Sequence, residues 1–285
     1  MRDYLIGSTV VLADGTIARA GGMVVKNVAG YDMSRFYVGS FGTLGVLVQA
    51  NFKTIPLPPH ARCFLAPLPE RTRDRAATQL AALSIRPSAA FVVRGFENAV
   101  DGEAGDEGRI FALIEGSDAL LERATLEIRS ALGRAGVPET RVIDAGARAS
   151  FERVVDAYVA CLGERSVTYG ITALGSGAER GALDVEALAL QHGLSAESIV
   201  DIMNGDAVVR VSDGDPLALG AKIETFDDAL HQMHPRARVF ASKHAHRTSL
   251  RVWGEPPAAL AQMKALKARF DPHRTLNPGR FIGGI

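Results

Sequence analysis

The chain is poor in cysteine, in tryptophan and in net charge. Its 285 residues include two cysteines and one tryptophan, and 32 basic side chains are balanced by 32 acidic ones. Cys63 and Cys161 lie far apart, without the close spacing of zinc ligands, so we expect two reduced thiols. Because positive charge is not in excess, there is no electrostatic basis for binding nucleic acid or an anionic membrane.

Long apolar segments are also absent. The uncharged stretch 36–52 is interrupted by Gly, Ser and Gln and is too short to span a bilayer. The N-terminus shows no apolar segment followed by a small-residue cleavage site, so we expect no signal peptide. With 47% hydrophobic and 22% charged residues, the composition is that of a globular protein of one large or two ordinary domains. We expect a cytoplasmic protein without direct membrane insertion.

Glycine, by contrast, is concentrated near the N-terminus. Residues 21–56 contain six glycines among apolar neighbours. Such a density marks backbone that turns tightly or lies close against another surface, where a Cβ would be in the way. Because the rest of the composition is ordinary, we expect that surface to be a large flat ligand.

The first sixty residues predict mainly β-structure. Asp14-Gly15 is a hairpin signal between two runs suited to strands, and Val46 begins a run in which side chains alternate between two faces. Three prolines, the first at Pro56, then indicate a domain boundary. The expected elements are strands at 8–12, 16–18, 23–26 and 46–53, and a short helix at 33–36.

The middle of the chain predicts alternating helices and strands. In 118–135, apolar residues recur at helical spacing. This texture indicates an α+β domain with a helix-covered sheet. The stretch 95–108 is expected to be a polar, acidic surface loop. We expect helices at 70–84, 118–135, 151–161 and 216–233, and strands at 91–94, 109–115, 166–171, 207–212 and 238–241.

The C-terminus predicts a helix that begins near Pro257 and is stopped by Asp271-Pro272. A turn with the sequence Leu276-Asn277-Pro278-Gly279-Arg280 follows. Taken alone, this ending is that of a helix-terminating tail.

Three motifs follow one another along the chain: KNVAGYD at 26–32, GSFGTLG at 39–45 and LNPGR at 276–280. Together they resemble the PCMH-type FAD-binding fold of the vanillyl-alcohol oxidase family, most closely its glycolate oxidase FAD-binding subunits. The close resemblance covers 1–58 and 255–285. It implies an α+β protein: the second half of an FAD-binding domain at 1–58, an α+β cap domain at 59–254, and a helix and tail at 255–285 that return to the flavin.

The resemblance also implies FAD as the cofactor. The glycine-rich turn would place backbone amides against pyrophosphate or flavin oxygens, and small residues suit anion binding by consecutive N–H groups. A side chain at Gly42 is expected to collide with the cofactor. The first residues of the following strand would lie near the adenosine half. The candidate cofactor-binding residues are Lys26, Asn27, Gly30, Tyr31, Asp32, Gly39, Ser40, Gly42, Thr43, Gly45, Val46 and Asn277.

The implied activity is FAD-dependent oxidation of a small 2-hydroxy acid in a glycolate-oxidase-like complex. A hydride from the α-carbon would reach flavin N5, and electrons would pass to an iron–sulfur partner subunit beside a catalytic flavoprotein. The chain would be cytoplasmic, or held at a membrane through these partners. No catalytic residue is assigned.

Two departures from the family keep alternatives open. The upstream α/β subdomain with the main pyrophosphate loop is not in this sequence, and the His-Gly-Asp-Gly-Asn-x-His metal motif of the catalytic members is absent. A non-catalytic assembly subunit, or a truncated remnant with a vestigial flavin cleft, is therefore the alternative. We expect that another polypeptide completes the fold if the chain is not a fragment.

Four histidines lie within sixteen positions: His231, His234, His244 and His246. Their surroundings are cationic, and no cysteine or carboxylate is placed to complete a metal site. We expect histidines at the surface or at a helix end. His244, His246 and Arg247 are weaker candidates for facing a substrate carboxylate.

Overall fold

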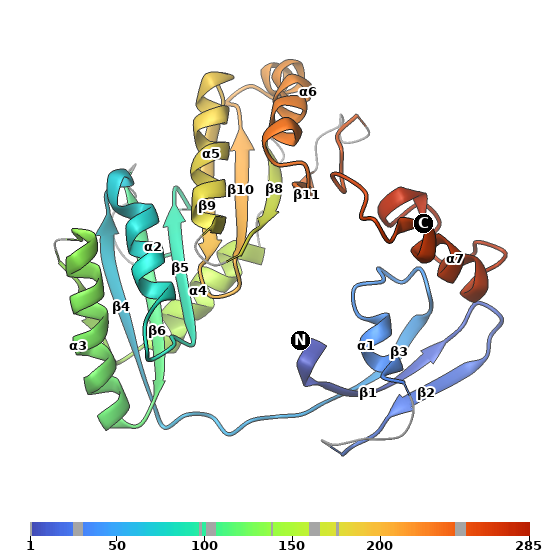
Figure 1. The fold of residues 1–285 in the computed structure, drawn as a ribbon, viewed down its shortest axis with the longest axis horizontal. Coiled ribbons are helices and arrows are strands. Elements are labelled where there is room, and N and C mark those ends of the chain that lie inside the picture. Colours follow the sequence, from blue (N-terminus) through green and yellow to red (C-terminus); the bar gives the residue numbers. More distant parts are fainter. Residues whose placement is uncertain are drawn as a thin grey trace. The chain divides into compact units, whose positions relative to one another are not determined.

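The computed structural model divides the chain into two compact units. Unit 1 comprises 1–57 and 256–285, and unit 2 comprises 58–255 (Figure 1). The structure describes residues 2–24, 31–96, 99–100, 107–137, 139–159, 166–174, 177–242 and 249–285.

Unit 1 contains a three-stranded antiparallel sheet in the order β2-β1-β3. At the predicted hairpin, the Leu12 N–H donates to Thr16 O over 2.9 Å, and Gly15 has a φ of +83°. The expected strand at 23–26 is wrong for Met23 and Val24, which follow the end of β2, and its other two residues lie outside the described ones. The bounds are β1 Leu5–Val11, β2 Ile17–Gly21 and β3 Val46–Phe52, with a 3-10 turn at Arg2–Tyr4.

Two helices complete unit 1: α1, Met33–Tyr37, and α7, Leu260–Phe270. They pack together through Phe36 and Phe270, whose ring centroids are 5.3 Å apart. The Ser34 and Ser8 hydroxyls, 2.9 Å apart and buried, join α1 to β1. Helix α7 begins three residues later than predicted, because Pro257 lies in a turn whose carbonyl accepts from the Leu260 N–H. A 3-10 turn, Ile282–Gly284, ends the chain.

Unit 2 is built on an eight-stranded antiparallel sheet in the order β11-β8-β10-β9-β5-β6-β4-β7 (Figure 1). Its strands alternate apolar side chains between two faces, so that Phe64 and Leu65 belong to different cores. The bounds are β4 His60–Leu68, β5 Ala89–Arg94, β6 Gly108–Gly116, β7 Arg141–Ile143, β8 Ser166–Thr172, β9 Ser195–Asp201, β10 Asp206–Ser212 and β11 Arg238–Ser242.

Helices cover both faces of this sheet. The larger core takes its helical side chains from α2, α3, α5 and α6, and the smaller core takes them from α4. The α+β architecture predicted from the sequence is confirmed. No helix in the described part of the chain is both long and apolar enough to cross a membrane. The bounds are α2 Arg73–Ala81 after a 3-10 turn at Glu70–Thr72, α3 Asp118–Ala135, α4 Ala147–Val159, α5 Gly177–Gln191 and α6 Pro216–Met233.

Two local expectations for unit 2 need correction. The segment 95–108 is not a purely polar loop, because Phe96, Ala99 and Val100 are buried in the smaller core. Strands β4, β7 and β9 and helix α5 were not predicted. Cys63 is buried in β4, whereas Cys161 lies outside the described residues.

A fully buried arginine ties α2 to α5. Arg73 donates from Nε to Glu179 over 2.6 Å and from Nη1 to Glu186 over 2.7 Å. Burial raises the pKa of Glu179 to about 7, although Arg73 acts in the opposite direction and Glu186 adds to the rise. The second carboxylate oxygen of Glu179, Oε2, has no hydrogen-bond partner among the described residues.

Candidate functional site

The glycine-rich turn folds back on itself through short hydrogen bonds. The Thr43 N–H and Thr43 Oγ1 both donate to Ser40 O, over 3.0 and 2.7 Å. Three residues of the turn have φ in the left-handed region: Gly39 at +85°, Phe41 at +52° and Gly42 at +72°. Glycine adopts such angles without strain, so the two glycines satisfy a backbone requirement. Phe41 is a non-glycine residue held in the same region.

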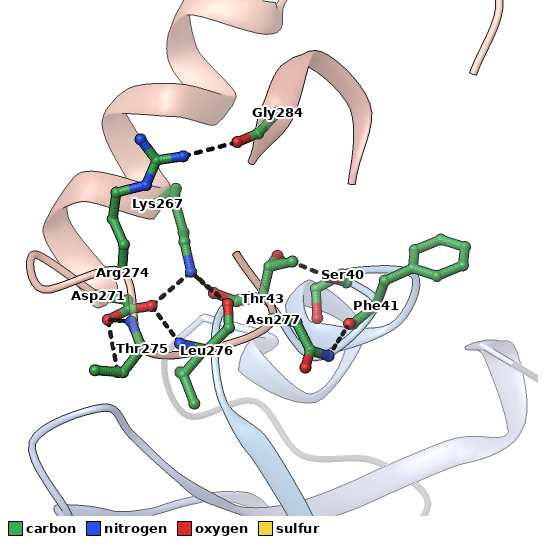
Figure 2. Close-up of polar contacts among 10 residues, drawn as sticks. All are labelled: Ser40, Phe41, Thr43, Lys267, Asp271, Arg274, Thr275, Leu276, Asn277 and Gly284. Atoms are coloured by element: carbon green, nitrogen blue, oxygen red, sulfur yellow. Dashed lines mark hydrogen bonds and ion pairs between the residues drawn. The ribbon is translucent and has the colours of Figure 1, made fainter. Parts of the chain in front are cut away.

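Side chains of the C-terminal segment donate hydrogen bonds to two carbonyl groups of this turn (Figure 2). Asn277 Nδ2 donates to Phe41 O over 2.7 Å, and Lys267 Nζ donates to Thr43 O over 2.8 Å. The rings of Phe41 and Phe281 stack with centroids 5.4 Å apart and planes inclined by 25°. The turn and the tail, more than 220 residues apart in sequence, therefore form one site within unit 1.

A buried carboxylate shapes the tail. Asp271 accepts from Lys267 Nζ over 2.6 Å, from the Leu276 N–H over 2.7 Å, and from both the N–H and the hydroxyl of Thr275. Burial alone would raise the pKa of Asp271, but these hydrogen bonds outweigh it and hold the pKa well below its usual range. Asp271 is therefore ionised at neutral pH and forms a buried ion pair with Lys267.

Two amides of the turn are available to a ligand. Within the described part of the chain, the N–H groups of Gly42 and Leu44 donate to no other group, and both residues are half-buried. Neighbouring free N–H groups are the donors with which a backbone turn binds an anion or a carbonyl oxygen. The side-chain amide oxygen of Asn277, Oδ1, likewise has no hydrogen-bond partner among the described residues. The turn thus fits a ligand with phosphate or carbonyl oxygens.

The other glycine of the motif has a packing role. A Cβ at residue 45 would lie 2.4 Å from Cγ1 of Val10, so Gly45 allows the turn to approach β1. A Cβ at residue 42 would lie 2.7 Å from Asn277 Nδ2. The first obstacle to a side chain at Gly42 is therefore the tail of the chain itself, in addition to any cofactor. At Gly39 the space is open.

The remaining candidate residues lie outside the 39–45 turn. Asp32 caps α1 by accepting from the Arg35 N–H over 3.0 Å, which gives its carboxylate a structural role. Tyr31 is 93% exposed, and Val46 is half exposed at the start of β3. Their contact with a flavin stays a prediction. Lys26, Asn27 and Gly30 lie outside the described residues.

Sequence reasoning missed Lys267. Its neighbours on α7 at helical spacing, Leu260, Met263 and Phe270, are apolar and only partly exposed. A lysine among such apolar residues is the signal of a buried, paired ammonium group. The other charged side chains of α7, on Lys264 and Arg269, are exposed.

The histidine cluster is only partly described. His231 is buried rather than at the surface: Nδ1 lies 2.8 Å from Asp227 O and Nε2 lies 3.1 Å from Ala237 O, which ties the end of α6 to the following turn. His234 is the C-cap residue of α6, and its Nε2 lies 3.4 Å from Asp184 Oδ2. His244, His246 and Arg247 lie outside the described residues.

Comparison with solved structures identifies the fold. The chain aligns over 97% of its length with substrate-bound p-cresol methylhydroxylase, with a TM-score of 0.70 at 14% identity, and covers 64% of that chain. The chain has the p-cresol methylhydroxylase fold. The PCMH-type fold predicted from the sequence is thus confirmed. A 4-ethylphenol oxidase from Gulosibacter chungangensis aligns with a TM-score of 0.61, and the glucooligosaccharide oxidase of Acremonium strictum, solved with FAD, with 0.56.

Curated sequence relatives include proteins named as glycolate oxidase subunits and as D-lactate dehydrogenases. The chain is 52% identical over 65 residues to glycolate oxidase subunit GlcD of Bacillus subtilis, covering 23% of this chain and 14% of that protein. It is 37% identical over 100 residues to glycolate oxidase subunit GlcE of Escherichia coli, covering 35% and 28%. A D-lactate dehydrogenase of Archaeoglobus fulgidus is 43% identical over 56 residues, covering 20% and 13%. No family model matches the chain.

The matches span less than a third of these curated relatives and less than two thirds of the solved neighbours named above. The similarity to glycolate oxidase subunits predicted from the three motifs is confirmed.

Proposed function

We propose that unit 1 binds FAD through the 39–45 turn and that the chain serves as the FAD-binding component of an enzyme that oxidises a small 2-hydroxy acid. The observation that carries the proposal is the turn itself, whose Gly42 and Leu44 amides have no acceptor within the described part of the chain. The fold, one of whose solved examples contains FAD, and the relatives named as glycolate oxidase subunits and D-lactate dehydrogenases support it.

The residues of the chain would hold and orient the cofactor. The amides of Gly42 and Leu44 would donate to pyrophosphate or flavin oxygens, and Asn277 would offer its amide oxygen from the tail. Lys26, Asn27, Gly30, Tyr31 and Asp32 are proposed to close over the flavin. FAD, when bound, supplies the two-electron acceptor for the hydride on the α-carbon of the acid. Catalytic groups are not assigned to this chain.

We further propose that the chain acts within a complex. Two relatives are named as subunits of glycolate oxidase, and both are much longer than the region that this chain matches. The proposed partners are a catalytic flavoprotein and an iron–sulfur subunit that takes the electrons. The complex would be cytoplasmic or attached to a membrane through these partners.

A non-catalytic assembly role is the second candidate, and strand β3 favours it. Among the described residues, strand β3 lies at an edge of its sheet, and it exposes Val46, Leu47, Val48 and Phe52, each about half accessible. Edge strands of this apolar character pair readily with another chain. A subunit that mainly joins partners would use this strand and would not need to turn over substrate.

Anaerobic flavin reduction separates the two functions. We expect the chain, purified with its co-expressed genomic neighbours, to show oxidised-flavin absorption near ~450 nm that is bleached by glycolate or D-lactate. Bound flavin that stays oxidised with every 2-hydroxy acid tried would favour the assembly role. A colourless complex, together with a colourless chain, would overturn the FAD proposal.

A further inference from the structure

We infer that Lys267 is a positioning residue, which aims the Leu44 amide of the turn at the ligand by holding the carbonyl group of the same peptide. Asn277 does the same for the Gly42 amide. The inference rests on the proposed function in that the ligand is taken to be FAD. The geometry that carries it belongs to unit 1 alone.

The ammonium group of Lys267 has no donor left for a ligand. Its side chain is nearly completely buried, and Nζ donates to Thr43 O over 2.8 Å, to Leu276 O over 2.7 Å and to Asp271 Oδ2 over 2.6 Å. Three N–H bonds therefore meet three acceptors (Figure 2). A buried lysine is costly unless it is fully paired in this way. Lys267 thus acts on the ligand only through the groups that it holds.

The carbonyl group of Thr43, which Lys267 binds, determines the direction of the Leu44 N–H. The Thr43 carbonyl and the Leu44 N–H belong to one planar trans peptide, so they point in opposite directions. Because Thr43 O is directed at Lys267, the Leu44 N–H is directed away from α7. The Phe41 carbonyl and the Gly42 N–H form a second such peptide, with Phe41 O directed at Asn277.

The Gly42 and Leu44 amides thus both belong to peptides whose carbonyl oxygen is bound by the tail. The Gly42 and Leu44 amides are two residues apart, and each has its carbonyl partner anchored by a different side chain. The N–H of Thr43, which lies between them in the sequence, donates to Ser40 O within the turn. The tail therefore prepares a pair of amides for one anionic or carbonyl-bearing group.

Asp271 fixes the ammonium group in turn. The carboxylate accepts from Lys267 and from the backbone of Thr275 and Leu276, so it holds α7 and the loop after it in one arrangement. Arg274 adds a hydrogen bond of 3.0 Å to Gly284 O, which attaches the last turn of the chain. The position of Nζ is thus set before any ligand arrives.

The test replaces Lys267 by methionine, which keeps the length of the side chain and removes the charge, and follows backbone amides by NMR in the full chain. In Lys267→Met, without FAD, we expect the Leu44 amide resonance to move more than that of Gly42. In Asn277→Ala we expect the reverse. Lys264→Met, on the exposed face of α7, is the matched control and should move neither. Equal movement of the two amides in both variants would overturn the inference.

FAD titration gives the second readout, on the form of the protein that holds flavin. We expect Lys267→Met to bind FAD about 10- to 100-fold more weakly, the effect of one misdirected donor, while amides of β1 keep their protection from hydrogen exchange. Unchanged affinity in a folded variant would contradict the positioning role. If the wild-type protein binds no FAD, the proposed function fails, and the amide resonances without FAD still decide whether Lys267 orients Leu44.

Discussion

Replacing Gly42 by valine is expected to reduce the bound flavin to below about one tenth of the wild-type content. Residue 42 has a φ of +72°, which costs a β-branched residue about 1 to 3 kcal/mol. Its Cβ would also lie 2.7 Å from Asn277 Nδ2, so the tail must move away from the Phe41 carbonyl. Flavin absorbance per mole of purified protein measures the effect. Full flavin content in Gly42→Val would exclude the turn as the FAD site.

Two further variants separate backbone strain from the collision with Asn277. Gly39 also has positive φ, but a Cβ there meets nothing within 4 Å, so Gly39→Ala carries the strain alone. Gly42→Ala carries both effects, and we expect it to lose more flavin than Gly39→Ala. Comparing Asn277→Ala with the double variant Gly42→Ala/Asn277→Ala completes a double-mutant cycle. The cost of Gly42→Ala should be smaller when Asn277 is already alanine.

Removing the Glu179 carboxyl group is expected to cost unit 2 about 1 to 3 kcal/mol of unfolding free energy, the usual penalty for a buried donor left without its acceptor, because Arg73 keeps its hydrogen bonds to Glu186. In Glu179→Ala the Nε of Arg73, which is fully buried, loses its acceptor. Unfolding can be followed by the fluorescence of Trp253, the single tryptophan of the chain, which belongs to unit 2. Glu152→Ala, on the exposed side of α4, is the control and should lie within about 0.5 kcal/mol of the wild type.

The same residue predicts a pH dependence. Because the folded-state pKa of Glu179, about 7, lies above its unfolded value, the folded protein binds the extra proton between these two pKa values. Its contribution to the unfolding free energy is therefore largest below about pH 4.5 and declines as the pH rises to about 7. Glu179→Gln, which keeps the size and the neutral form, should flatten this decline. An identical slope in wild type and variant would show that Glu179 is ionised throughout.

The elements that the sequence predicts best are those with local end signals. Helix α3 runs over the predicted residues because Ser117 caps its start and Gly136, with a φ of +83°, ends it. Helix α6 likewise begins at Pro216 behind the capping side chain of Asp215. In these two helices the apolar stripe and the end signals indicate the same residues, so tertiary packing changes the predicted bounds little.

Helix α5 and strand β4 were missed because tertiary packing overrides their local signals. Gly181 resembles a helix breaker, but a Cβ there would lie 3.2 Å from Ile171 Cγ2, so the glycine allows α5 to approach β8. Pro67 argues against a strand, yet it lies beyond 63–65, the residues of β4 that pair with β7. Neither contact can be inferred from neighbouring residues.

The candidate site likewise has one part that local sequence predicts and one part that depends on residues far apart in the chain. The glycine-rich turn was predictable, because its glycines meet backbone demands that are local, with positive φ at Gly39 and Gly42. The role of Lys267 was not, because it depends on a carbonyl group 224 residues earlier in the chain. Asn277 was predicted as a flavin contact, and the structure adds that its Nδ2 is engaged by Phe41 O.

The most direct measurement is the response of the turn's own amides to FAD, recorded by NMR on the form of the protein that retains flavin. The amide resonances of Gly42 and Leu44 should shift markedly when FAD is added, while those of Arg73 and Glu179, which belong to unit 2, stay unchanged. Retention of flavin without any movement of these two amides would mean that the cofactor binds elsewhere, and the turn could no longer be regarded as its site.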